Sequence, residues 1–213
     1  MTIRHHLSEP LLMAYAAGHL PEAFSLVVAT HLSLCDDCRA RAGAFEAVGG
    51  ALLDAGNETA MGDQALDRAL ARLDGPLPPQ RPEARAAGIF PAPLAGYVGG
   101  DLATVRWQRV GGGVRQAILP TGKGAMARLV YIPAGKAVPD HGHRGIELTL
   151  VLQGAFADAA GRYDRGDVEI SDDAVVHTPT ALAGLDCICL TAAEAPLRFR
   201  GLIPRVAQRW LRI

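Results

Sequence analysis

One histidine and two cysteines stand close together near the amino terminus. His31, Cys35 and Cys38 follow an H-x3-C-x2-C spacing. Two thiolates separated by one tight turn converge on one point, and a histidine one helical turn earlier lies on the same face, so the spacing suits a tetrahedral metal ion. A structural zinc takes four ligands, and this motif supplies three. The nearest upstream donors are the neighbouring His5 and His6, either of which would tie the amino terminus to the helices.

A second set of possible metal ligands lies in the carboxyl-terminal half. His141 and His143 alternate along an expected strand, so both side chains face the same side, and Glu147 follows at an even spacing. Three inward donors from adjacent strands leave coordination positions open. His177 is the only other histidine beyond residue 94, which makes it the candidate for a fourth ligand.

The cysteines could also have roles that involve no metal. Cys35-Asp-Asp-Cys38 has the spacing of a redox dithiol, but the two acids between the thiols disfavour the thiolate. Cys187 and Cys189 would face the same way on a strand. We expect them to be buried and inert, with a sensing thiol as the alternative.

Helices must position the first set of ligands. Ser8-Glu9-Pro10 predicts a helix start, and Gly18 predicts its stop. Two further helices are expected, one from Pro21 to about Leu34 and one over about residues 37–54.

A fourth helix is predicted over residues 63–73. Leu66, Leu70 and Leu73 recur on it at helical spacing and form a narrow apolar stripe on a polar helix. Such a stripe either packs locally or docks on a partner.

The second set of ligands requires strands. Six prolines without an apolar period predict a linker at residues 76–93. Seven short β-rich stretches with glycine turns then predict a sandwich or small barrel over residues 94–196, followed by a basic segment at 197–213. The expected fold is therefore multidomain, with a small all-α helical domain at 1–75 and an all-β domain after the linker.

Charge and composition exclude several function classes. Among the 213 residues, positions 1–75 carry 5 basic and 10 acidic side chains, a balance of −5 that is unsuited to gripping phosphates. It suits a basic protein surface instead. The sequence contains no run of about 18 apolar residues, so it predicts no membrane span. Its first residues lack the apolar stretch of a signal peptide. A cytoplasmic protein is expected, in which cysteines beside a histidine bind metal rather than form disulfides.

Residues Gly135 to Gly154 resemble the first cupin motif, G-x5-H-x-H-x3-E-x6-G, at every specified position. Gly166-Asp167 resembles the start of the second motif, although the usual Pro-x-Gly is absent before the histidine. The resemblance implies a jelly-roll, or double-stranded β-helix, barrel that binds a divalent metal, with zinc first and manganese, iron or nickel as alternatives. Its ligands by similarity are His141, His143, Glu147 and His177.

The amino-terminal motif is similar to a zinc-binding anti-sigma domain. Joined to a cupin barrel, it resembles the ChrR-type anti-sigma factors over nearly the whole chain. The resemblance implies a structural zinc held by His6, His31, Cys35 and Cys38, with His5 as a possible substitute for His6.

The same resemblance implies a function. It predicts a cytoplasmic repressor that is not an enzyme and that binds a stress-response sigma factor of the extracytoplasmic-function type as a 1:1 heterodimer. It also implies a signal, singlet oxygen or a related oxidative stress, sensed through the cupin domain. Leu66, Leu70 and Leu73 are then expected at the partner surface.

Two alternatives belong to other function classes. A metal-dependent cupin enzyme, a dioxygenase or isomerase with an accessory zinc domain, would use the barrel ligands, with Tyr131 and Tyr163 as the nearest acid–base groups. A zinc-finger protein that binds DNA would need a basic first domain, and this one is acidic.

Overall fold

The computed structural model describes residues 2–73, 75 and 88–199, and every structural statement below concerns these residues. Most of the predicted linker and of the basic carboxyl-terminal segment lies outside them. No helix of the described chain is long and apolar enough to span a membrane. The helices are α1 (Glu9–Ala16), α2 (Glu22–Leu32), α3 (Asp36–Asp54), α4 (Ala65–Leu73), α5 (Ala92–Val98) and a short 3-10 turn, η1 (Leu102–Thr104).

The four helices predicted for the first part of the chain are present. Pro10 occupies the first turn of α1, where its missing N–H costs nothing. Gly18, with a φ of +70°, follows the end of α1. The Cys35 side chain caps α3 by accepting from the Cys38 N–H. The helix α5 was not predicted, and it begins where we expected the linker to end.

The rest of the chain forms antiparallel strands. A six-stranded sheet has the order β1-β2-β3-β11-β5-β8, and two three-stranded sheets have the orders β10-β6-β7 and β12-β4-β9. The strands are β1 (Gln108–Gly111), β2 (Val114–Ile118), β3 (Met126–Ile132), β4 (His141–Gly142), β5 (Glu147–Gln153), β6 (Ala155–Ala157), β7 (Arg162–Asp164), β8 (Val168–Ser171), β9 (Val176–His177), β10 (Thr180–Ala181), β11 (Cys187–Ala193) and β12 (Arg198–Phe199).

Side chains of the large sheet alternate between two environments, as the pleat of a strand requires. One face carries aliphatic residues of the central strands, such as Leu129, Leu150 and Leu190, which share a core with the helices. The other face lines an internal cavity and includes Arg128 and Thr191.

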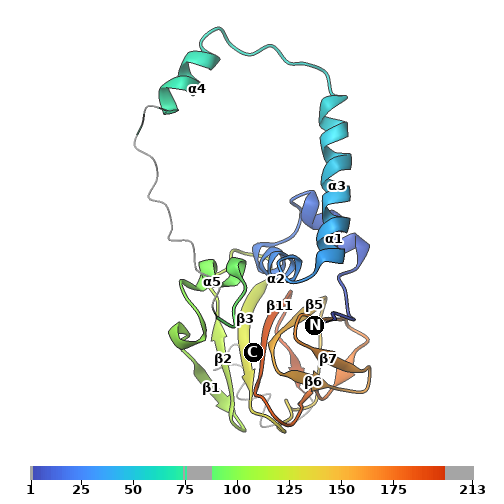
Figure 1. The fold of residues 1–213 in the computed structure, drawn as a ribbon. Helices are drawn as coiled ribbons and strands as arrows, with labels where there is room; N and C mark the ends of the chain where they lie inside the picture. The colour runs from blue at the N-terminus through green and yellow to red at the C-terminus, as the bar shows by residue number, and fades with distance from the viewer. Residues whose placement is uncertain (1, 74, 76–87, 200–213) are drawn as a thin grey trace.

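The helical part and the barrel share one hydrophobic core. In Figure 1 the helix α2 lies against the sheet, and it contacts β3, β5 and β11. Phe24, Val27 and Val28 of α2 are fully or almost fully buried in the same cluster as the sheet leucines. The predicted linker is therefore not the only connection between the two parts.

The far end of α3 and the whole of α4 stand away from this core. Figure 1 shows α3 rising from the barrel and α4 lying apart from the other elements. Every residue from Glu46 to Asp54 is exposed, and α4 buries none of its residues within the described chain. The two elements are therefore free to meet another molecule.

Candidate metal centres

The structure brings together the four residues predicted to hold the amino-terminal zinc. One ligand atom from each of His6, His31, Cys35 and Cys38 lies within 4.8 Å of the others. The Nδ1 atom of His6 is 3.3 Å from the Cys35 Sγ and 3.6 Å from the Cys38 Sγ. The end of α2 supplies His31 and the start of α3 supplies both thiols, so the cluster fixes the junction of two helices.

His31 is arranged as a metal ligand. Its Nδ1 is 2.9 Å from the carbonyl oxygen of Gly166, to which it donates, and its buried Nε2 has no hydrogen-bond partner among the described residues. A ligating histidine characteristically donates its other ring N–H to an acceptor in this way. Burial lowers the pKa of His31 to about 4, although the hydrogen bond to Gly166 works to raise it. The ring is therefore neutral, and its second nitrogen carries a lone pair.

The buried Cys38 thiol needs a cation in order to ionise. Burial raises the pKa of the Cys38 thiol to about 11. A zinc ion in the cluster would favour the thiolate, because binding couples to loss of the thiol proton. The orphaned nitrogen of His31 and the convergent thiols therefore fit a structural zinc.

His5 and His6, which the sequence left as alternatives, face different ways. The His5 ring packs against Tyr163, with centroids 4.4 Å apart, and its Nε2 lies 3.1 Å from the Arg162 carbonyl oxygen. Only His6 of this pair contacts the thiols.

The turn between β7 and β8 holds the amino-terminal segment against the barrel. One Asp167 carboxylate oxygen accepts from the backbone N–H groups of Arg4 and His5, at 2.7 and 3.0 Å, and the Val168 N–H donates to the His5 carbonyl oxygen. Gly166 adopts a φ of +90°, a region that favours glycine. This turn corresponds to the second cupin motif.

A cluster of three histidines occupies the barrel. His141, His143 and His177 place ring nitrogens within 4.8 Å of one another, and all three are buried. The Nδ1 of His141 donates to the Pro139 carbonyl oxygen at 2.8 Å. The Nε2 atoms of His143 and His177 are hydrogen-bonded to each other at 3.1 Å, and a metal ion bound by both rings would take the place of the proton that they share. The site fits a divalent metal.

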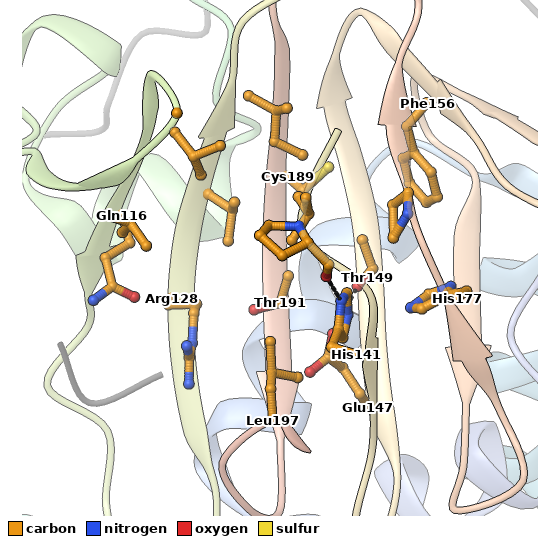
Figure 2. Close-up of a pocket in the computed structure, with 18 of the residues that line it drawn as sticks. Gln116, Arg128, His141, Glu147, Thr149, Phe156, His177, Cys189, Thr191 and Leu197 are labelled. Atoms are coloured by element: carbon orange, nitrogen blue, oxygen red, sulfur yellow. Dashed lines mark hydrogen bonds between the residues drawn. The ribbon is translucent and has the colours of Figure 1, made fainter. Parts of the chain in front are cut away.

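Glu147 stands beside this cluster rather than within it. Its carboxylate is 3.7 Å from the Nδ1 of His143, and it is outside the group of atoms that converge. It lines the same cavity as His141 and His177 (Figure 2).

Two further carboxylates orient His177, and the sequence analysis missed both. The Nδ1 of His177 lies 2.7 Å from Asp158 and 3.2 Å from Glu169. Burial works to lower the pKa of His177, but the two acids outweigh it and raise that pKa above its ordinary value. Their contacts mark Nδ1 as the protonated nitrogen and Nε2 as the one that faces His143.

The barrel encloses a cavity of about 290 Å³ beside the histidines. Figure 2 shows Arg128 and Gln116 on one side of Thr191, and His177 on the other. Cys189 also lines the cavity, and its thiol is 3.6 Å from that of Cys187. Both cysteines are buried, as expected, although one of them faces an open space rather than packed side chains.

The three leucines proposed to meet a partner are all exposed. Leu66 is 68% exposed, Leu70 50% and Leu73 75%, so the stripe does not pack locally within the described chain. The projecting half of α3 adds Val48, which is 60% exposed, and Leu52, which is 70% exposed.

Comparison with known proteins matches both the barrel and the whole chain. Residues 97–196 match the family model described as the ChrR cupin-like domain. The chain is 60% identical to the anti-sigma-E factor ChrR of Cereibacter sphaeroides over 213 residues, which is all of both proteins.

Solved structures agree. The crystal structure of Rhodobacter sphaeroides SigE in complex with the anti-sigma ChrR matches with 61% identity and a TM-score of 0.81, over 91% of this chain and 100% of that one. An RmlC-like cupin protein of Ralstonia eutropha matches at 22% identity and a TM-score of 0.40, over 46% of this chain and 68% of that one, a likeness too remote to carry weight. Because the identity extends from end to end and includes the helical part as well as the barrel, this chain belongs to the ChrR family of anti-sigma factors.

Proposed function

We propose that this chain is an anti-sigma factor that binds a stress-response sigma factor of the extracytoplasmic-function type in a 1:1 complex and thereby inhibits transcription. The observation that carries the proposal is the identity of 60% over the full length of an anti-sigma-E factor. The match to a solved complex of such a factor with its sigma factor supports the same assignment. The function is binding rather than catalysis, so the cupin enzyme alternative is set aside.

The exposed helices supply the partner surface in this proposal. Leu66, Leu70 and Leu73 of α4 form an unburied apolar stripe of the helix-in-groove kind. The acidic balance of residues 1–75 complements the basic surfaces that a sigma factor uses to meet DNA. The chain itself is proposed to make no contact with nucleic acid.

Two metal ions belong to the proposal. His6, His31, Cys35 and Cys38 would hold a structural zinc that fixes the junction of α2 and α3. His141, His143 and His177, with Glu147 as the fourth ligand, would hold a divalent ion, zinc first and manganese, iron or nickel as alternatives. Glu147 is retained because it lies 3.7 Å from His143 and lines the same cavity.

The barrel would serve as the sensor. An oxidative signal, singlet oxygen or a related species, would act on the cupin domain and weaken the hold on the sigma factor. Because RNA polymerase and its sigma factors work in the cytoplasm, the chain would act there.

The proposal is tested by expressing the full-length chain with each extracytoplasmic-function sigma factor of its source genome and isolating the complexes. We expect one sigma factor to co-purify, native mass spectrometry to give a 1:1 mass, and metal analysis to give at least one zinc per chain. Recovery of the chain alone with every sigma factor tested would reject the proposal.

A further inference from the structure

The cavity inside the barrel holds a charge that the anti-sigma function does not use. Arg128 lies on β3, it is only 5% exposed, and its side chain lines the cavity. Its Nη1 has no hydrogen-bond partner among the described residues, and its Nη2 contacts only the weak acceptor Met126 Sδ, at 3.4 Å. Glu147 attracts the guanidinium electrostatically, but no described carboxylate is hydrogen-bonded to it. A buried guanidinium N–H without an acceptor is costly, which indicates that a ligand with an anionic acceptor belongs beside it.

The sheet register places Arg128 at the end of a polar row. Arg128 pairs with Thr191 of β11, Thr191 with Thr149 of β5, and Thr149 with Glu169 of β8. Neighbours in register on one sheet face stand side by side, so four adjacent strands present one polar line to the cavity. Glu169 then leads to His177 and the histidine cluster, 3.2 Å away.

The adjoining walls are apolar. Val130 and Cys189 occupy the next row along β3 and β11, and they are register partners. Val114, Ile132 and Phe156 also line the cavity. The cavity is therefore amphipathic, with the Arg128 guanidinium at one end of the polar row and aliphatic and aromatic side chains beside that row.

The charge and size of the cavity indicate which kind of ligand would fit it. A planar guanidinium matches a carboxylate, which it binds through two parallel hydrogen bonds. Glu147 and Glu169 also line the cavity and would repel an anion of higher charge, so a monoanion suits the site better than a phosphate. The volume of about 290 Å³ is at the lower end of the usual range for small-molecule sites and limits the apolar tail to a short chain.

We propose that the cupin cavity of this chain is a binding site for a small amphipathic carboxylic acid, whose carboxylate pairs with Arg128 and whose short apolar tail packs against Val114, Val130, Ile132 and Phe156. The site is separate from the sigma surface on α3 and α4. Binding is therefore measurable on the chain alone, and a failure here leaves the anti-sigma assignment untouched.

Calorimetric titration of the purified full-length chain with hexanoate tests the proposal. Saturable binding is expected for hexanoate, and binding at least 10-fold weaker for 1-hexanol and hexylamine, which keep the tail but cannot pair with a cation. The same three compounds also separate pairing with Arg128 from simple filling of an apolar cavity.

Two matched variants assign the effect to one residue. Arg128→Met should weaken hexanoate binding at least 10-fold, while Arg109→Met, which removes an exposed arginine from β1, two strands away in the same sheet, should leave it unchanged. Arg128→Lys, which keeps the charge but not the planar pair of donors, is expected to fall between them and serves as the test if the methionine variant fails to fold. Hexanoate binding that is equal in wild type and both Arg128 variants would overturn the proposal, as would no binding of any saturated acid of four to eight carbons.

Discussion

His31 divides its two ring nitrogens between the two halves of the molecule. One donates to the Gly166 carbonyl of the barrel, and the other is buried, with no hydrogen-bond partner in the described part of the chain, in the cluster that contains His6 and the two thiols. A metal at this point would tie the amino-terminal segment, two helices and a barrel turn together. The loss of one ligand should therefore disturb more than the zinc content.

Replacing the neighbouring histidines tests this geometry with a matched pair. His6→Ala is expected to abolish stable zinc binding at the amino-terminal site, because His6 contacts both thiols, while His5→Ala keeps the zinc. Metal analysis after dialysis against a chelator gives the readout, with loss of about one zinc per chain only for His6→Ala. The reverse pattern would show that the assignment of the two histidines is wrong.

The sequence alone predicts the members of this cluster except for the choice between His5 and His6. The H-x3-C-x2-C spacing fixes three donors because a short local segment sets their geometry. His5 and His6 are neighbours, and their directions depend on contacts with Asp167 and Tyr163, more than 150 positions away in the chain. No local pattern contains that information.

The turn between β7 and β8, together with the first two residues of β8, contacts both clusters of candidate metal ligands. Four consecutive residues take part: Gly166 accepts from His31, Asp167 and Val168 bind the backbone around His5, and Glu169 contacts His177. A change at the barrel histidines therefore has a short physical route to the zinc ligands. Coupling through such a route is reciprocal, so zinc binding would also affect the barrel site.

Substituting Asp167 measures the strength of this link. Asp167 is fully buried and accepts from two N–H groups of the amino-terminal segment, so Asp167→Asn should lower the free energy of unfolding by about 1–3 kcal/mol and speed zinc release to a chelator. Asp164→Asn is the control, because that carboxylate pairs with Arg162 at the surface, and its effect should stay within about 0.5 kcal/mol. Equal zinc release from both variants would show that the turn does not hold the site.

The exposed stripe of α4 gives a second prediction at this scale. Leu66→Ala combined with Leu70→Ala should leave the melting temperature unchanged, since neither side chain is buried, and should weaken the sigma complex at least 10-fold. Arg68→Ala, on the same helix, is the control and should bind normally. Undiminished affinity of the double variant in a titration with the sigma factor would remove α4 from the interface.

Elements were predicted correctly where a short stretch of sequence contains their pattern. The spacing of the α4 leucines and the glycine turns between strands were enough to locate these elements. The short helix α5 was missed because prolines at its start read as linker. Asp158 and Glu169 were missed because acids in a strand and a turn carry no motif until the sheet brings them to His177.

The described part of the molecule has one hydrophobic cluster shared by the helices and the large sheet, a second cluster inside the barrel, and a projecting arm. The helix α2 packs on the central sheet, so the helices that carry the candidate zinc ligands share buried contacts with the barrel. The sequence predicts a helical part, a linker and a barrel from composition alone, and the packing of α2 on the sheet could not be read from it because those contacts join residues far apart in the chain. The exposed end of α3 and all of α4 form the arm, and it carries the proposed partner surface.

Transcription in a purified system tests the central claim most directly. RNA polymerase, the sigma factor that co-purifies with the chain and a promoter it recognises are titrated with the full-length protein before initiation. Transcription is expected to fall linearly with the amount of added protein and to cease when about one chain is present per sigma factor. A polymerase that carries an unrelated sigma factor should stay active. Undiminished transcription at a large excess of the zinc-loaded chain would contradict the assignment of this protein as an anti-sigma factor.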